Sequence, residues 1–222
     1  MNNAIPVIAI DGPSASGKGT VAQKVAEALG FHYLDSGALY RLVTFAALKR
    51  GIDMEDESAL AETARAMGIE FCADRAWLEG LDVTEDLRTE TVSAAASRVA
   101  ANPAVRTALL SRQRGFQRPP GLVADGRDMG SVVFPDAALK VFLTADVAIR
   151  AERRYKQLME KGMCAKMPDV VEDLRRRDSR DASRAVAPLK HYPDAFFLDT
   201  TGLSVDEAVR KILEWWREKA SR

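Results

Sequence analysis

Residues 12–20 read GPSASGKGT and follow, after Asp11, the apolar run IPVIAI at residues 5–10, which is rich in β-branched side chains. A buried strand, a glycine loop and a helix in this order are typical of a phosphate-binding loop, G-x-x-x-x-G-K-[ST]. The glycines let backbone N–H groups turn toward phosphate oxygens, and the following helix adds its positive N-terminal end. Lys18 can reach the β- and γ-phosphates. An ordinary glycine turn is the alternative, and the flanking strand and helix disfavour it.

The loop departs from the usual pattern at one position. Gly19 follows Lys18 where a hydroxyl residue is expected, and the threonine comes one step later, at Thr20. In GTPases and many ATPases that hydroxyl ligates Mg²⁺. Glycine cannot, so we expect Mg²⁺ to be held mainly by the triphosphate and water, with no metal ligand from the protein. The GKGT ending is the form found in nucleoside monophosphate kinases, and the N-K-x-D motif of GTPases is absent.

Strands and helices are expected to alternate along most of the chain. Short apolar runs predict strands at 5–10, 31–35, 122–125, 139–145 and 195–199, and helical periodicity predicts helices at 19–30, 36–51, 103–116, 146–161 and 204–219. This order predicts an α/β fold with a P-loop NTPase-type parallel sheet and helices on both faces. Ser204 and Glu207 should form a capping box at the start of the last helix. Residues 62–95 lack this alternation and favour a small antiparallel insertion.

Composition narrows the possible partners. The chain has 222 residues, 47% of them hydrophobic, which is enough for one sizeable core. Lys+Arg and Asp+Glu both number 32, so the basic excess typical of nucleic-acid-coating proteins is missing. No signal peptide or long apolar segment is found. Cys72 and Cys164 belong to no metal-binding cluster and are expected to be reduced, part-buried thiols. We expect a cytoplasmic protein with no nucleic-acid or membrane partner.

Two further motifs suggest a second anion site. In YLDSGALYR, Ser36 begins a helix and Arg41 follows on it, which suits a monophosphate, although a plain N-cap and a solvated charge fit equally well. In ADGRDMG, Arg127 and Asp128 follow a predicted strand at the edge where open α/β sheets bind ligands. Arg127 could clamp a phosphate and Asp128 could accept hydrogen bonds from a sugar or base. A loop with an internal ion pair is the alternative.

Eight arginines fall between residues 150 and 184, on two predicted helices joined by KGMCAKMPDV. The spacing of Arg177, Asp181 and Arg184 places them on one helix face. A solvated charged helix is the usual outcome for such a run. Two arginine-rich helices around a flexible connector also describe a lid over a triphosphate, where arginines would offset charge on the transferring phosphoryl group. The eight are Arg150, Arg153, Arg154, Arg175, Arg176, Arg177, Arg180 and Arg184.

Together, GPSASGKGT, LDSGALYR, GLVADGRDMGSVVFPDA and RDSRDASRAVAPL resemble the bacterial-type cytidylate kinases, in order and spacing across nearly the whole chain. The resemblance implies one P-loop kinase domain over residues 1–222, with a core at about 1–60, 103–150 and 185–222. It also implies a CMP-binding insertion at 62–102, a helical lid at 150–184 and a monomer. The implied reaction is γ-phosphoryl transfer from ATP to CMP or dCMP, with Mg²⁺ bound to the ATP. The implied ATP-binding residues are Gly12, Pro13, Ser14, Ala15, Ser16, Gly17, Lys18, Gly19 and Thr20. The implied CMP-binding residues are Ser36, Arg41, Ser97, Arg106, Arg127, Asp128, Arg177, Asp181 and Arg184.

Such a reaction needs charge neutralisation more than a general base. The accepting phosphate has a second pKa near 6 and is already anionic at neutral pH. We therefore assign the catalytic roles to Lys18, Arg154 and Arg177, which would offset repulsion between the two polyanions. Two alternatives stay open: another small-acceptor P-loop kinase of the adenylate, guanylate or shikimate type, and a non-catalytic nucleotide-sensing module.

Overall fold

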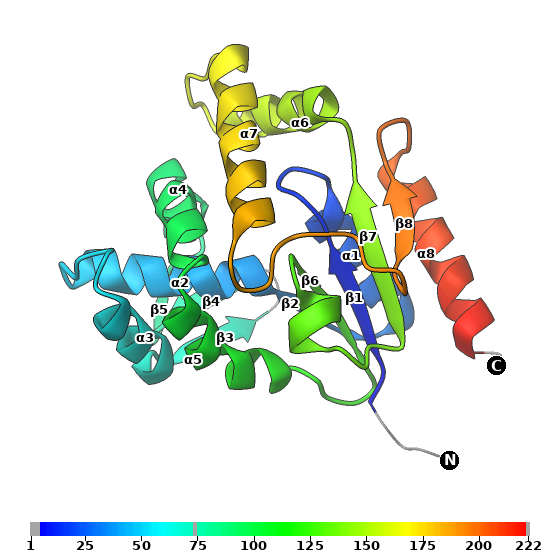
Figure 1. Cartoon of the computed structure of the whole chain (residues 1–222), viewed down its shortest axis with the longest axis horizontal. Helices are drawn as coiled ribbons and strands as arrows, with labels where there is room; N and C mark the ends of the chain where they lie inside the picture. The colour runs from blue at the N-terminus through cyan, green and yellow to red at the C-terminus, as the bar shows by residue number, and fades with distance from the viewer. Residues whose placement is uncertain (1–4, 73–74, 221–222) are drawn as a thin grey trace. The chain divides into compact units, whose positions relative to one another are not determined.

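The computed structural model describes residues 5–72 and 75–220 (Figure 1). The chain divides into two compact units, Met1–Leu34 with Phe116–Arg222, and Asp35–Gly115. The predicted insertion at 62–102 falls inside the second unit, and its limits stay a prediction. None of the helices in the described part of the chain has the length and apolarity needed to cross a bilayer.

The first unit is built on a five-stranded sheet in the order β2-β6-β1-β7-β8. Its strands are β1 (Val7–Asp11), β2 (His32–Asp35), β6 (Leu122–Gly126), β7 (Leu139–Thr144) and β8 (Phe196–Asp199). β1 pairs in parallel with β6 and with β7, and β7 pairs in parallel with β8. The predicted α/β fold class is confirmed. β6 and β7 lie on opposite sides of β1, so the order of the strands reverses direction at β1. The ends of β1 and β6 therefore flank a topological switch point, where such sheets bind ligands.

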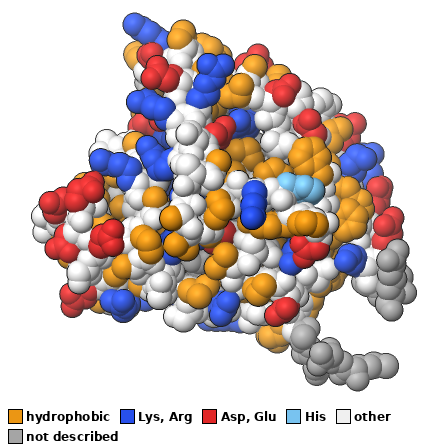
Figure 2. Space-filling model, in the orientation of Figure 1, with side chains coloured by type: hydrophobic (Ala, Val, Ile, Leu, Met, Phe, Trp, Pro, Cys, Tyr) orange, Lys and Arg blue, Asp and Glu red, His pale blue; other side chains and the backbone are white. Residues whose placement is uncertain are grey.

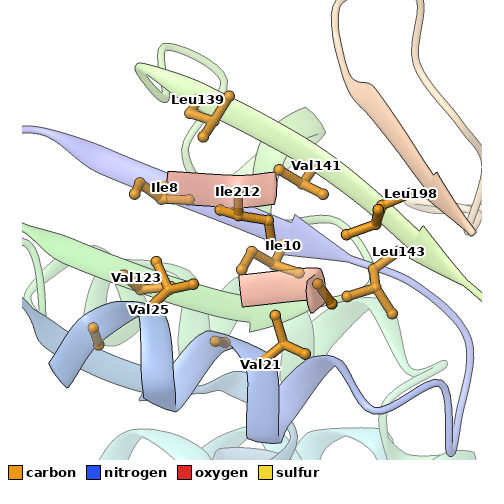
Figure 3. Packing of buried hydrophobic residues seen from close by; sticks show 13 residues of the cluster. Ile8, Ile10, Val21, Val25, Val123, Leu139, Val141, Leu143, Leu198 and Ile212 are labelled. Atoms are coloured by element: carbon orange, nitrogen blue, oxygen red, sulfur yellow. The ribbon is translucent and has the colours of Figure 1, made fainter. Parts of the chain in front are cut away.

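One face of the sheet is covered by α1 (Lys18–Leu29) and α8 (Val205–Ala220). Figure 3 shows Ile8 and Ile10 of β1 packed among Val21 and Val25 of α1 and Ile212 of α8. All five are at most 2% exposed, which makes this apolar layer the main stabilising contact of the sheet. The predicted capping box of α8 is confirmed, because Ser204 N donates to Glu207 Oε2 at 2.8 Å and Glu207 N donates to Ser204 Oγ at 3.3 Å.

The opposite face carries the alternate residues of β1, Ala9 and Asp11, and is covered by η2 (Met129–Val133), a single π-helical turn. A Cβ added at Gly130 would lie 3.5 Å from the Ala9 Cβ and 3.2 Å from the Lys140 Cγ, so this turn lies directly on the sheet. Glycine at position 130 allows that close approach. The sequence did not predict η2, because five residues are too few to show a helical period.

After β7, the chain forms α6 (Val147–Glu160) and α7 (Met167–Ser183), which lie beyond the carboxyl ends of β1 and β7 (Figure 1). A small apolar cluster joins the two helices: Ala151, Leu158, Val170 and Leu174. Figure 2 shows basic and acidic side chains interspersed over this pair of helices. The apolar residues therefore hold the helices together while their charged residues remain at the surface.

The second unit contains α2 (Ser36–Lys49), α3 (Glu57–Ala66), β3 (Ile69–Cys72), β4 (Arg75–Leu78), β5 (Leu81–Asp82), η1 (Asp86–Arg88), α4 (Glu90–Val99) and α5 (Pro103–Arg114). β3, β4 and β5 pair in antiparallel fashion, as the sequence predicted. α3 and α4 were not predicted as helices. Both begin at side-chain caps, where Asp56 accepts from Ala59 N and Thr89 accepts from Val92 N.

Candidate active site

The phosphate-binding loop joins β1 to α1 and presses against the sheet. A Cβ at Gly12 would lie 1.9 Å from the Leu143 carbonyl oxygen, so only glycine fits there. Gly17 is the N-cap of α1, with a φ of 91°, and no side chain caps the helix. The first-turn N–H groups of a helix have no intrahelical partner. An uncapped start of this kind therefore leaves backbone donors for an anion at the positive end of α1.

Three side chains of the loop show how it suits a polyphosphate. Ser16 is 1% exposed, and its Oγ has no hydrogen-bond partner among the described residues. The Lys18 Nζ lies 3.5 Å from the Pro13 carbonyl oxygen, so the ammonium group folds back over the loop. Thr20, whose hydroxyl is displaced by one position, is exposed. A buried hydroxyl and an ammonium group therefore border the same turn of backbone.

Two arginines of α6 donate hydrogen bonds to carbonyl groups of the phosphate-binding loop. Arg150 donates to Ser14 O at 3.1 Å and forms a bidentate pair with Asp178 of α7, at 3.1 and 2.6 Å. Arg153 donates to Ser16 O at 3.0 Å and to Thr200 O at 2.8 Å. These guanidinium groups therefore fix the carbonyl groups of Ser14 and Ser16 toward α6.

Arg127 connects the loop after β6 to both the phosphate-binding loop and α7. Its Nη2 donates to Ser14 Oγ at 2.8 Å, and its Nε donates to Asp181 Oδ2 at 2.8 Å. Asp181 is 7% exposed, and its carbonyl accepts from Arg184 Nε at 3.4 Å. The structure therefore brings three residues of the predicted acceptor site, Arg127, Asp181 and Arg184, into contact beside Ser14.

A buried carboxylate lies beside Gly19. Asp125, at the end of β6, is 4% exposed and accepts a hydrogen bond from the Tyr33 hydroxyl at 3.0 Å. A Cβ at Gly19 would lie 3.0 Å from the Asp125 Oδ2 and 3.5 Å from the Tyr33 oxygen. The space that a side chain would need at position 19 is thus occupied by an acidic group.

A second buried carboxylate, Asp11, ends β1 and is 3% exposed. Its Oδ1 accepts from Met129 N and its Oδ2 accepts from Gly130 N, both at 2.8 Å. Burial raises the pKa of Asp11 to about 7, while the two N–H donors and the nearby Arg127 oppose that rise. Burial likewise raises the pKa of Tyr192, which lies near the charges of Asp11, Asp128 and Arg184.

In the second unit, Arg41 is fixed at the start of α2. Asp35 caps this helix by accepting from Ala38 N at 3.0 Å, and its other oxygen accepts from Arg41 Nη2 at 2.6 Å. A Cβ at Gly37 would lie 3.1 Å from Arg41 Nη1, so glycine leaves room for the guanidinium. Ser36 is buried within the first turn. The N-cap is therefore Asp35, and the reading of Ser36 as a plain N-cap was wrong.

Ser97 and Arg106 come from α4 and α5 of the same unit. Arg106 is 8% exposed, donates to Ala100 O at 3.1 Å and lies over the Tyr40 ring, with 5.8 Å between the guanidinium carbon and the ring centroid. Ser97 is half-buried on α4, which packs against α2. A buried arginine stacked on a tyrosine has a fixed guanidinium plane, which suits recognition of a planar or bidentate partner.

The family model for cytidylate kinase matches residues 8–218. The chain belongs to the cytidylate kinase family. A cytidylate kinase from Chromobacterium violaceum is 60% identical over 215 residues, 97% of each chain. Another from Bordetella bronchiseptica is 56% identical over 214 residues, 96% of each chain. The solved structure of an uncharacterized protein from Eubacterium ventriosum has a TM-score of 0.53 at 13% identity, covering 95% of this chain and 97% of its own, and shares the fold.

Two expectations for this cytidylate kinase family member need correction. Arg184 does not share a helix face with Arg177 and Asp181, because α7 ends at Ser183 and Arg184 has an extended ψ of 134°. Its Nε instead turns back to the last turn of the helix. Cys72 and Cys164 are free, but both are exposed rather than part-buried. Cys72 lies on the exposed face of β3, where half-buried and exposed residues alternate, and Cys164 lies in the connection between α6 and α7.

The two lid arginines chosen from the sequence differ in their surroundings. Arg177 pairs with Asp173 one turn earlier on α7, with 2.7 Å between its Nε and the carboxylate. Arg154 is half-buried on α6. Two other arginines of α6, Arg150 and Arg153, donate hydrogen bonds to carbonyl groups of the phosphate-binding loop. Sequence spacing could not separate these four, since it gives no register between α6 and the loop carbonyls.

Proposed function

We propose that this protein transfers the γ-phosphoryl group of ATP to CMP or dCMP, giving ADP and CDP or dCDP. It is a phosphotransferase of the cytidylate kinase family. The observation that supports this function best is the pairing of an uncapped glycine loop with Arg127, which donates both to Ser14 of that loop and to Asp181. This contact supports a donor site at the loop with Arg127 and Asp181 beside it as part of the acceptor site.

The donor site comprises residues 12–20. Main-chain N–H groups of residues 14–20 would bind the phosphates of ATP, and Lys18 would contact the β- and γ-phosphates. The buried Ser16 hydroxyl, without a partner among the described residues, would donate to a phosphate oxygen. Arg150 and Arg153 would keep the loop in this shape by binding its carbonyl groups rather than the nucleotide.

Magnesium fits this donor set without a direct protein ligand. Gly19 offers no hydroxyl, and Mg²⁺ readily keeps several waters when it binds a nucleotide. The Asp125 carboxylate, oriented by the Tyr33 hydroxyl, is placed beside Gly19 and could accept hydrogen bonds from those waters. The ion would supply charge neutralisation at the β- and γ-phosphates.

The proposed CMP-binding residues are mostly arginines and polar side chains. They are Ser36, Arg41, Ser97, Arg106, Arg127, Asp128, Arg177, Asp181 and Arg184. Guanidinium groups suit the monophosphate, because they bind its oxygens in a bidentate manner. Asp128 and Asp181 are hydrogen-bond acceptors for the cytosine amine or the sugar. A pocket that pairs with an amine rejects a base that lacks it.

The chain's own residues would act by alignment and neutralisation. The CMP phosphate is already anionic near neutral pH, so no side chain has to remove a proton. Lys18, Arg154 and Arg177 would offset the repulsion between the two nucleotides as the phosphoryl group moves in line. Closure of α6 and α7 as a lid would exclude water, which otherwise competes as the acceptor.

A coupled ADP-release assay across nucleoside monophosphates and shikimate tests the reaction. We expect CMP and dCMP to give the highest kcat/KM. If AMP, GMP or shikimate exceeds them, a different small-acceptor kinase is the answer, and ATP binding without turnover would identify a nucleotide sensor.

Asp128→Ala tests the acceptor pocket. It should raise the CMP KM at least tenfold while changing the ATP KM little, because the lost acceptor faces only one substrate. The matched control is Asp136→Ala, at an exposed position just after η2, which should leave both values unchanged. Equal effects of Asp128→Ala on both KM values would remove Asp128 from the acceptor pocket.

We also propose that the protein is a monomer of the cytoplasm. The resemblance to bacterial-type cytidylate kinases supports the monomer, and its substrates, ATP and a nucleoside monophosphate, are metabolites of that compartment. Light scattering on a gel-filtration column would test the first statement, since a dimer would elute with a mass near twice 24.3 kDa. Cell fractionation would test the second.

A further inference from the structure

Asp11 is a buried charged residue that the proposed mechanism does not use. It ends the central strand β1, next to Gly12, and its side chain lies on the face of the sheet covered by η2. Both carboxylate oxygens accept backbone N–H groups at 2.8 Å, one from Met129 and one from Gly130. Two such bonds to an ionised carboxylate are charge-assisted and strong for their size.

These two bonds act on the residues that directly follow Arg127 and Asp128. Met129 and Gly130 open η2, where N–H groups have no partner within the helix, and the side chain of Asp128 does not cap it. Asp11, on strand β1, therefore accepts hydrogen bonds from N–H groups that the side chain of an N-cap residue would otherwise accept. The backbone of Asp128, with φ of −149° and ψ of 24°, lies between this tether and Arg127.

We propose that Asp11 is a positioning residue of the CMP site, whose ionised carboxylate fixes the backbone that carries Arg127 and Asp128. This inference rests on the proposed role of those two side chains in binding CMP. When Asp11 takes up a proton, one of its oxygens becomes a hydroxyl and accepts an N–H group poorly. One of the two tethers then weakens, and the acceptor pocket loosens while the ATP loop keeps its own contacts.

Burial of Asp11, modified by the charges around it, places this change near neutral pH. Arg127 lowers its pKa and Asp128 raises it from the loop after β6, and the Asp11 charge in turn raises the pKa of Tyr192, in the segment after α7. On the same face, Lys140 of β7 is bound to Asp194 at 2.6 Å. Burial outweighs the two N–H donors and Arg127, so the pKa of Asp11 rises to about 7.

The first experiment needs no variant. In the ¹⁵N-labelled full chain without nucleotide, the amide signals of Met129 and Gly130 are followed by NMR from pH 5.5 to 8.5. Both should titrate together with a midpoint near 7, because they share one carboxylate. Amide signals at these positions that stay constant across this range would overturn the proposal.

The second experiment separates positioning from general stability. Asp11→Asn keeps the shape but presents an NH₂ group to one N–H, and we expect the CMP KM to rise about tenfold at pH 8 with the ATP KM within twofold. The wild-type CMP KM should approach that of the variant as pH falls below 7. The matched control, Asp53→Asn, removes an exposed carboxylate that accepts Glu55 N and should change neither KM.

The outcomes distinguish this inference from the proposed function. Equal rises in both KM values, or an unchanged CMP KM in Asp11→Asn, would overturn the positioning role while CMP turnover in the wild type still supports the reaction. Absence of CMP turnover in the wild type would instead refute the proposed function. The amide titration reports on the tether in either case.

Discussion

Replacing Arg150 by methionine should destabilise the protein more than any surface change on α6 or α7. Arg150 is 6% exposed and donates to Ala145 O at 2.9 Å, to Ser14 O at 3.1 Å and to both oxygens of Asp178. A net hydrogen bond contributes about 1 kcal/mol, and one to a charged group about 1.5–3 kcal/mol. The Asp178 side chain is 29% exposed and stays partly hydrated, so we use the low end of the range for its hydrogen bonds to Arg150.

The expected loss in the free energy of unfolding is then about 3 kcal/mol, since methionine retains the packing of the aliphatic stem. For a chain of this length, that loss lowers Tm by about 6–12 °C. Scanning calorimetry and urea unfolding would measure it. The control is Arg176→Met, on the exposed face of α7, which should change the free energy by no more than about 0.5 kcal/mol.

A double-mutant cycle with Asp178→Asn identifies the pair itself, because residues in direct contact couple by about 0.5–3 kcal/mol. Arg150→Lys should recover little of the loss, since an ammonium group cannot replace the bidentate fork. The ATP KM should rise in Arg150→Met, because Ser14 O loses its donor. A Tm change in Arg150→Met no larger than in Arg176→Met would refute the reasoning.

Three further predictions follow from backbone and charge. Gly19→Ala should lower Tm and kcat, because the new Cβ lies 3.0 Å from the buried Asp125 Oδ2 and overpacking costs about 1–3 kcal/mol. The control is Gly202→Ala, whose Cβ meets nothing within 4 Å, and equal Tm values for the two variants would contradict the prediction. Ala15→Gly should leave Tm unchanged or raise it, since Ala15 has a φ of 58°, which strains any residue except glycine. The control, Ala94→Gly on the exposed face of α4, should lower the free energy of unfolding by about 1 kcal/mol. Equal losses of stability in urea unfolding would argue against strain at Ala15. The pKa of Asp11 is raised from 3.8 to about 7, so its contribution to stability is full below pH 4 and is lost as pH rises through 7, by about 4 kcal/mol at most. In urea unfolding across this range, the free energy of unfolding should fall with pH more steeply for the wild type than for Asp11→Asn, and a rise or an equal fall would contradict the prediction.

The elements that the sequence predicted well are those with a local signal. β1, the phosphate-binding loop and α1 are marked by an apolar run, glycines and a helical stripe, and Gly30 closes α1 with a φ of 65° as expected. α3 and α4 have no comparable signal, because they are short and rich in alanine, and alanine fits a core or a surface equally well. Their caps at Asp56 and Thr89 were the available indication.

The functional residues that the sequence missed act through long-range contacts. Arg150 and Arg153 bind carbonyl oxygens of Ser14 and Ser16, more than a hundred residues away, and main-chain acceptors have no sequence signature. The sequence did contain a signal for a role of Asp11, because a carboxylate at the end of a buried strand must find hydrogen-bond partners or lose its charge. The direction of its side chain, toward η2, required the structure because η2 itself was not predicted.

The glycine that follows Lys18 departs from the usual phosphate-binding motif, and the same position lies against the buried Asp125 carboxylate. A hydroxyl residue after Lys18 would need the space beside α1 that the Asp125 carboxylate and the Tyr33 hydroxyl fill. In P-loop NTPases with a hydroxyl after the lysine, that hydroxyl and a carboxylate from a neighbouring strand both reach Mg²⁺. Here glycine stands at this position and the Asp125 carboxylate lies beside it. The glycine is thus consistent with water-mediated binding of Mg²⁺, in which the acidic group acts at one remove. On this view Asp125→Ala should make Gly19→Ala harmless to stability, because the atom that the new Cβ meets is gone.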